Sequence, residues 1–171
     1  MNSLHWIIAA VIAPIPLFHL WLHALLPFWR KRPLLIYFVS IFVWAAALAY
    51  FYWLNLRSEY IFEFNAVWRI ILGYLLMAIG TVGIFASIIT LGPKRFFVWA
   101  VLKPHSVSAA RIEKGPFRFI PHPAYIGYLF VAVGSFMSRG QFYLLYLVIY
   151  LFILTPIVIY FEEEELRRRV L

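Results

Sequence analysis

Residues 34–56 read LLIYFVSIFVWAAALAYFYWLNL, and residues 70–91 read IILGYLLMAIGTVGIFASIITL. Neither stretch contains a charged side chain. As a helix, each is long enough to cross roughly 30 Å of hydrocarbon. The two stretches therefore predict an all-α integral membrane protein.

The composition of the whole chain agrees with this prediction. Of the 171 residues, 65% are hydrophobic and 13% are charged, whereas soluble proteins have roughly 45–50% and 25%. The chain has no cysteine, which excludes disulfides, zinc thiolate sites and cysteine nucleophiles. The net charge of +8 is spread over short basic clusters between apolar runs, a distribution that indicates membrane topology rather than binding to nucleic acid.

Three further apolar runs extend over Leu4–Phe28, Ala124–Ser138 and Phe142–Phe161. The last two are separated only by Arg139, Gly140 and Gln141, so they are expected to form a helical hairpin. We therefore expect about five transmembrane helices. The first run lacks a basic segment before it and is too long for a signal-peptide core, so we treat it as a retained helix.

The basic residues predict the orientation of the chain. In a five-span arrangement, twelve of the fifteen Lys and Arg residues fall on one side and three on the other. Since cytoplasmic loops carry the excess of Lys and Arg, we expect an external N-terminus, and a long loop and a C-terminus in the cytoplasm. The three on the external side are Arg57, Arg69 and Arg139.

The polar part of the chain begins after residue 91 and includes KGPFRFIPHPAYIGY at residues 114–128. Its three prolines forbid a continuous helix and push the residues before them, Gly115, Ile120 and His122, toward extended backbone. Pro123 suits the first position of the next helix, with His122 beside its N-cap. Gly127, one turn later, leaves room for another backbone or a ligand to approach.

Four glutamates, Glu162 to Glu165, follow the last apolar run. Carboxylates at a helix C-terminus oppose the macrodipole and repel one another, so a cation is needed, either from the following arginines or from a bound ligand. Because the hairpin is antiparallel, Glu162 and Glu163 return to the membrane face of His122. The same face then also holds Arg118.

The two motifs together resemble a known family. The pattern Gly-Pro-aromatic-Arg-aromatic-x-x-His-Pro-x-Tyr-x-Gly, then a hairpin, then Glu-Glu-x-x-Leu, is similar to that of the isoprenylcysteine carboxyl methyltransferases and the related phospholipid N-methyltransferases. The resemblance covers about residues 92–166 and divides the chain into a three-helix membrane region, 1–91, and a methyltransferase-like region, 92–171. The matching residues are Gly115, Pro116, Phe117, Arg118, Phe119, His122, Pro123, Tyr125, Gly127, Glu162, Glu163 and Leu166.

The resemblance implies a membrane-embedded methyltransferase that uses S-adenosylmethionine without a Rossmann fold, and it implies no metal site. The cofactor would lie between the long cytoplasmic loop, the His-Pro motif and the end of the last helix, where the glutamates balance its sulfonium and ammonium charges. Departing from the family pattern, Pro121 stands where relatives commonly have Arg. The cofactor-binding candidates are His122, Pro123, Tyr125, Gly127, Glu162 and Glu163.

The methyl acceptor stays open at this point. A carboxylate acceptor needs a cationic clamp, for which Arg118 is the candidate, whereas an amine acceptor needs a base, His122 or Glu163. Arg118 and His122 are therefore the candidate catalytic residues. The acceptor is expected to be lipidic or prenylated, a small molecule or a protein, in the inner membrane of a bacterium or the endoplasmic reticulum of a eukaryote.

A lipidic acceptor is expected to enter sideways from the bilayer. We expect its entrance between the third and fourth runs, where Gly80 and Gly83 keep side-chain bulk low, with the reaction near Tyr125 and Gly127.

Two rival interpretations remain. His19 and His23 lie four residues apart on one helix face, which would suit a haem- or quinone-binding subunit, but histidines hydrogen-bonded to their neighbours are the favoured interpretation. A non-catalytic member of the same fold is the other rival.

Overall fold

The computed structural model describes residues 4–61, 66–106 and 112–170, and in these ranges the secondary structure is helical apart from an isolated bridge between Tyr60 and Gln141. This confirms the all-α prediction. The helices are α1 (His5–Ile12), α2 (Pro14–Ala24), α3 (Leu26–Lys31), α4 (Pro33–Arg57), α5 (Val67–Leu91), α6 (Pro93–Phe96), α7 (Trp99–Leu102), η1 (Pro104–Ser106), η2 (Gly115–Arg118), α8 (Pro123–Arg139) and α9 (Phe142–Val170).

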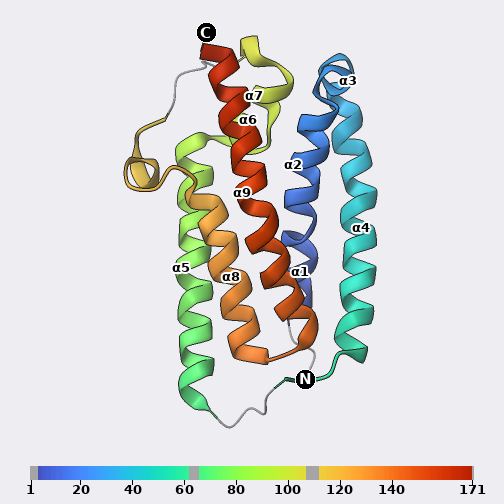
Figure 1. Ribbon diagram of the computed structural model, residues 1–171, viewed down its shortest axis with the longest axis vertical. Coiled ribbons are helices and arrows are strands. Elements are labelled where there is room, and N and C mark those ends of the chain that lie inside the picture. Colours follow the sequence, from blue (N-terminus) through green and yellow to red (C-terminus); the bar gives the residue numbers. More distant parts are fainter. Residues whose placement is uncertain (1–3, 62–65, 107–111, 171) are drawn as a thin grey trace.

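The long helices form one bundle, in which α8 and α9 lie between α5 on one side and α1, α2 and α4 on the other (Figure 1). Among the described residues, four stretches are long and apolar enough to cross a membrane: His5–Ala24, Pro33–Arg57, Val67–Leu91 and Phe142–Arg168. The fifth expected span is α8, whose 17 residues extend about 25 Å at helical rise. It is the shortest of the five expected spans.

The predicted hairpin is present. Helix α8 ends at Arg139, and α9 begins at Phe142. Gly140 caps α8 in the left-handed conformation, with φ of 68°, which glycine adopts without steric cost. Helix α9 therefore runs back along α8, and its C-terminal glutamates reach the end of the bundle where α8 begins (Figure 1).

Glycines hold α5 against α8 at backbone distance. A Cβ atom placed on Gly80 would lie 2.5 Å from the Gly127 carbonyl oxygen, and one placed on Gly127 would lie 2.7 Å from that of Gly80. Gly73 and Gly134 make an equivalent pair nearer the turn of the hairpin. Such contact needs residues without side chains. The expected lipid entrance between these two helices is therefore wrong, because their backbones touch there.

The loop before α8 has the predicted boundaries but a different path. Helix α8 begins at Pro123 with His122 as its N-cap residue, as expected. Gly115, however, is not extended: it has φ of 55° and opens the short helix η2. A Cβ atom on Gly115 would lie 2.8 Å from the Thr90 hydroxyl oxygen, so this turn rests on the end of α5.

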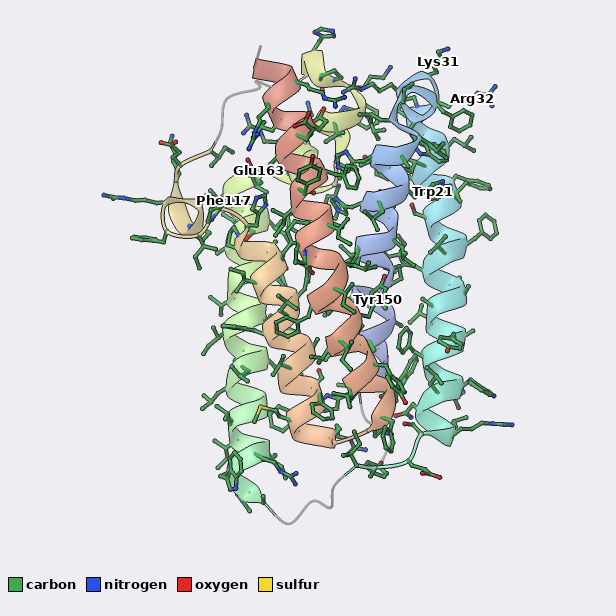
Figure 2. All side chains as sticks on the ribbon, in the orientation of Figure 1. Trp21, Lys31, Arg32, Phe117, Tyr150 and Glu163 are labelled. Carbon is green, nitrogen blue, oxygen red and sulfur yellow. The ribbon has the colours of Figure 1, made fainter. Side chains whose placement is uncertain are left out.

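An apolar cluster stabilises the side of this end of the bundle that lies opposite the loop before α8. It joins α2, α3, α4 and the α6–α7 segment through five buried side chains, so the short helices are fixed to the long ones. Lys31 and Arg32 lie at this end of the bundle, as does Glu163 (Figure 2). The buried members are Leu22, Trp29, Ile36, Val98 and Leu102.

Candidate functional site

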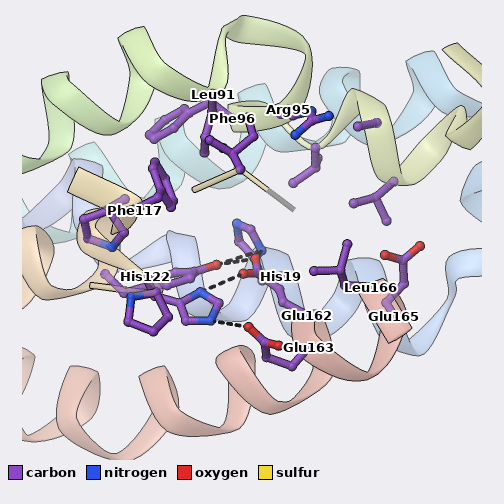
Figure 3. Close-up of a pocket in the computed structure, with 18 of the residues that line it drawn as sticks. His19, Leu91, Arg95, Phe96, Phe117, His122, Glu162, Glu163, Glu165 and Leu166 are labelled. Atoms are coloured by element: carbon purple, nitrogen blue, oxygen red, sulfur yellow. Dashed lines mark hydrogen bonds and ion pairs between the residues drawn. The ribbon is translucent and has the colours of Figure 1, made fainter. Parts of the chain in front are cut away.

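A cavity of about 230 Å³ lies at the end of the bundle that holds the α9 glutamates. Its walls come from α2, the α5–α7 segment, the loop before α8, the start of α8 and the end of α9 (Figure 3). Segments distant in the sequence thus meet around one space. The cavity contains most of the ionisable side chains that the sequence motifs bring to this face.

The first pair in the cavity joins the two sequence motifs. The His122 Nε2 atom lies 2.9 Å from Oε1 of Glu163, and the other ring nitrogen, Nδ1, lies 3.8 Å from Oε2 of Glu162. His122 leads into α8, and the two glutamates belong to α9, so the antiparallel hairpin places the imidazole against both carboxylates, as predicted.

Glu162 also contacts two other groups. His19 Nδ1 lies 2.7 Å from Glu162 Oε1, and the Tyr125 hydroxyl donates a hydrogen bond to the same oxygen. The Tyr125 hydroxyl is also 3.2 Å from His19 Nδ1. Helices α2, α8 and α9 therefore converge on one carboxylate. The side chains of His19 and Glu162 are 12% and 25% exposed, which leaves the carboxylate accessible from the cavity.

The far wall of the cavity is held by an ion pair. Arg30 lies 3.0 Å from Glu165 Oε1 and donates a second bond, 3.1 Å long, to the Val101 carbonyl. Glu165 is buried, whereas Arg30 is about 38% exposed. Arg30 thus links α3, α7 and α9 at the rim and neutralises one of the carboxylates that line the cavity.

The rest of the lining is apolar or aromatic, with one guanidinium. Among the described residues that line the cavity, Arg95 is the only Lys or Arg. Phe96 and Phe117 contribute aromatic rings (Figure 3). Val98, which also lines it, has a left-handed backbone with φ of 57°. A β-branched residue rarely adopts that conformation, so the tertiary contacts of the buried cluster must hold it there.

The structure brings together five of the predicted site residues: His122, Pro123, Tyr125, Glu162 and Glu163 all line the cavity.

Gly127 and Arg118 lie elsewhere. Gly127 contacts the backbone of α5 at Gly80. Arg118 is exposed, and its guanidinium lies 5.9 Å from the centre of the Phe119 ring, outside the cavity lining.

Sequence reasoning placed no residue of the first apolar run in the site, yet His19 and His23 on α2 line the cavity. Their four-residue spacing was the available signal. Donor atoms of His19, His23 and Glu162 lie within 4.8 Å of one another, a grouping that can suit a metal ion. His19 and Glu162, however, are in direct hydrogen-bonding contact. This contact agrees with the favoured interpretation of His19, and His23 stacks on Phe161 with ring centres 6.3 Å apart.

A comparison with known families identifies the part of the chain that supplies all of the cavity lining except the residues of α2. The family model described as phospholipid methyltransferase matches residues 68–170. The match extends from the start of α5 to the end of α9, and it leaves out α1 to α4. No curated protein and no solved structure matches the chain significantly.

Proposed function

The chain belongs to the phospholipid methyltransferase family, and from this premise we propose that it transfers a methyl group from S-adenosylmethionine to the amine head group of a membrane lipid. One observation carries the proposal: the paired His122 and Glu163 share a cavity with Glu162 at the end of a membrane bundle. The division of the chain into regions 1–91 and 92–171 stays a prediction.

The residues present fit the cofactor. S-adenosylmethionine carries a sulfonium and an ammonium, and bound to this site it would supply a methyl group on a good leaving group. Glu162 and Glu163 offer two carboxylates to those cations, and the guanidinium of Arg95 suits a carboxylate. The rings of Phe96 and Phe117 can stack on a cation or a base.

The residues of the chain then have separate tasks. The apolar and aromatic walls exclude water, which strengthens each charge interaction within the cavity. Glu162 and Tyr125 would orient the bound cation. The His122–Glu163 pair would accept the proton that an ammonium head group must lose before its nitrogen can attack, as a general base does.

The charges of the lining support an amine acceptor over a carboxylate. Three glutamates line the cavity, and one of them, Glu165, is paired with Arg30. Arg95 is the only Lys or Arg among the described residues of the lining. Arg118, the clamp considered for a carboxylate, is exposed outside the lining. A carboxylate acceptor would therefore meet like charges with a single cation to compensate, whereas an amine would meet opposite charges.

The test is to place the purified protein in nanodiscs with methyl-labelled S-adenosylmethionine, with phosphatidylethanolamine in one arm and a prenylcysteine analogue in the other. We expect label in the phosphatidylethanolamine arm and its loss in His122→Ala. Label confined to the prenylcysteine arm would replace the amine proposal by carboxyl methylation. Cofactor binding without labelled product in either arm would favour a non-catalytic member of the fold.

A further inference from the structure

We propose that His19, on α2, is a positioning residue of the cofactor site, holding the Glu162 carboxylate in the orientation that receives a cation. This inference rests on the proposed function. It assigns a role to a helix outside residues 68–170, the region that the family model matches.

The geometry at Glu162 supports this role. His19 Nδ1 and the Tyr125 hydroxyl both contact the same oxygen, Oε1. The second oxygen, Oε2, takes part in neither contact and lies on the side of His122, 3.8 Å from its Nδ1. Two donors on one oxygen fix the rotation of the carboxylate and turn Oε2 toward the His122 side of the site (Figure 3).

A carboxylate on a long, flexible side chain needs such support. A glutamate side chain loses roughly 1.5–2 kcal/mol of rotamer entropy when it is fixed, and a binding site is tighter when that loss occurs on folding rather than on binding. His19 is mostly buried, at 12% exposed, and its ring packs edge-on against Tyr125 with centres 5.8 Å apart. It is therefore itself held in place.

The depth of α2 along α9 is also fixed. The Tyr150 hydroxyl of α9 donates a 2.7 Å hydrogen bond to the carbonyl of Ala13, which separates α1 from α2. Tyr150 lies in the first third of α9, nearer the hairpin turn than Glu163 is (Figure 2). His19 is less than two helical turns beyond Ala13, so this bond sets the level at which its ring meets Glu162.

The experiment measures the affinity for S-adenosylmethionine by calorimetry in the full chain. His19→Ala removes the donor, and His19→Asn restores one, because its amide nitrogen stands near the position of Nδ1. We expect about a 10-fold loss of affinity in His19→Ala, the lower end for a hydrogen bond to a charged group, and recovery of most of it in His19→Asn. His5→Ala is the matched control: it removes another buried histidine of the same span, outside the cavity lining, and should bind as the wild type does.

A double-mutant cycle with Glu162→Gln separates positioning from a general loss of packing. If His19 acts through Glu162, His19→Ala should add little to the loss in Glu162→Gln. Affinity in His19→Ala within twofold of the wild type, or fully additive losses, would overturn the inference while leaving the proposed function intact.

A measurement without cofactor keeps the two proposals distinguishable. In the protein labelled with ¹⁵N-histidine, Glu162→Gln should shift the Nδ1 resonance of His19. An unchanged resonance overturns the role of His19 even where the cofactor binds. If the wild-type protein does not bind S-adenosylmethionine, the proposed function fails, and the positioning role fails with it.

Discussion

His122 and Glu163 form the contact on which the proposed site most depends. Their 2.9 Å pair joins the start of α8 to the end of α9 inside the cavity. We expect His122→Ala and Glu163→Gln each to weaken S-adenosylmethionine binding by about 10- to 100-fold, since a hydrogen bond to a charged group contributes roughly 1.5–3 kcal/mol. Calorimetry on the purified variants measures this.

Arg118→Ala is the control for that prediction, because this arginine is exposed outside the cavity lining. Its affinity for the cofactor should stay within twofold of the wild type. A loss in Arg118→Ala as large as that in His122→Ala would mean that the loop before α8 brings its guanidinium to the cofactor.

The sequence predicts those contacts between residues that follow from the hairpin of α8 and α9 without knowledge of the other helices. The short turn is enough to place Glu162 and Glu163 opposite His122. The position of Arg118 depends on the direction of η2, which the backbone of Gly115 determines and no periodicity encodes. His19 was missed because its contact with Glu162 depends on which helix packs against α9, a question of tertiary structure.

The glycine contact between α5 and α8 gives a prediction at the scale of elements. Gly127→Ala would bring a methyl group 2.7 Å from the Gly80 carbonyl, so the helices must separate. Overpacking of this kind costs typically about 1–3 kcal/mol. We expect a lower thermal unfolding temperature in detergent, with cofactor affinity falling in parallel because α8 carries His122 and Tyr125.

Gly83→Ala, on the facing helix α5, is the matched control. Its added methyl group would meet the Pro123 carbonyl at 3.7 Å, an ordinary van der Waals distance, and the unfolding temperature should be nearly unchanged. Equal unfolding temperatures for Gly127→Ala and Gly83→Ala would contradict the close approach of the two backbones.

The ion pair between Arg30 and Glu165 gives a second prediction at this scale. Arg30→Gln removes the guanidinium that pairs with the buried Glu165 carboxylate, which costs about 1–3 kcal/mol, toward the lower end because Arg30 is about 38% exposed and partly screened. Chemical unfolding in detergent measures the loss.

Arg168→Gln removes a comparable contact, 3.1 Å between Arg168 and Glu164 on one exposed helix face. A surface pair four residues apart contributes under about 0.5 kcal/mol, so this control should be nearly neutral. An equal loss of unfolding free energy in both variants would mean that the link that Arg30 makes between α3, α7 and α9 does not stabilise the protein.

The long helices could largely be predicted from the apolar runs. The points at which a run divides into separate helices could not. The run Leu4–Phe28 was expected to be a single helix, but the structure divides it into α1, α2 and α3. Prolines stand in the first turns of α2 and α3, where their missing N–H costs least. Whether a proline kinks a helix or starts a new one depends on the packing around it, which the sequence pattern does not contain.

At the scale of the whole molecule, the basic residues separate as predicted. The end of the bundle that holds the cavity carries those of α3, α6 and the C-terminal part of α9, whereas Arg57, Arg69 and Arg139 belong to helix ends at the other end (Figure 1). Arg111 lies outside the described residues. The structure thus fixes which segments share a side, and the positive-inside rule predicts that the side with the cavity is cytoplasmic.

This prediction can be tested with little perturbation because the chain has no cysteine, so a single introduced thiol is the only target for a maleimide. Glu59→Cys and Ser106→Cys place an exposed thiol after α4 and after α7, at opposite ends of the bundle. In intact cells, an impermeant maleimide should label Glu59→Cys at once and Ser106→Cys only after permeabilisation, while the wild type stays unlabelled.

The reverse labelling pattern would place the cavity outside the cytoplasm, away from the compartment that supplies S-adenosylmethionine, and would count against both the orientation and the proposed function. Labelling of both thiols in intact cells would mean that the chain inserts in two orientations, a result that the excess of twelve basic residues over three argues against. The expected pattern instead lets a soluble cofactor enter from the cytoplasm while a lipid head group approaches at the interface of the same leaflet.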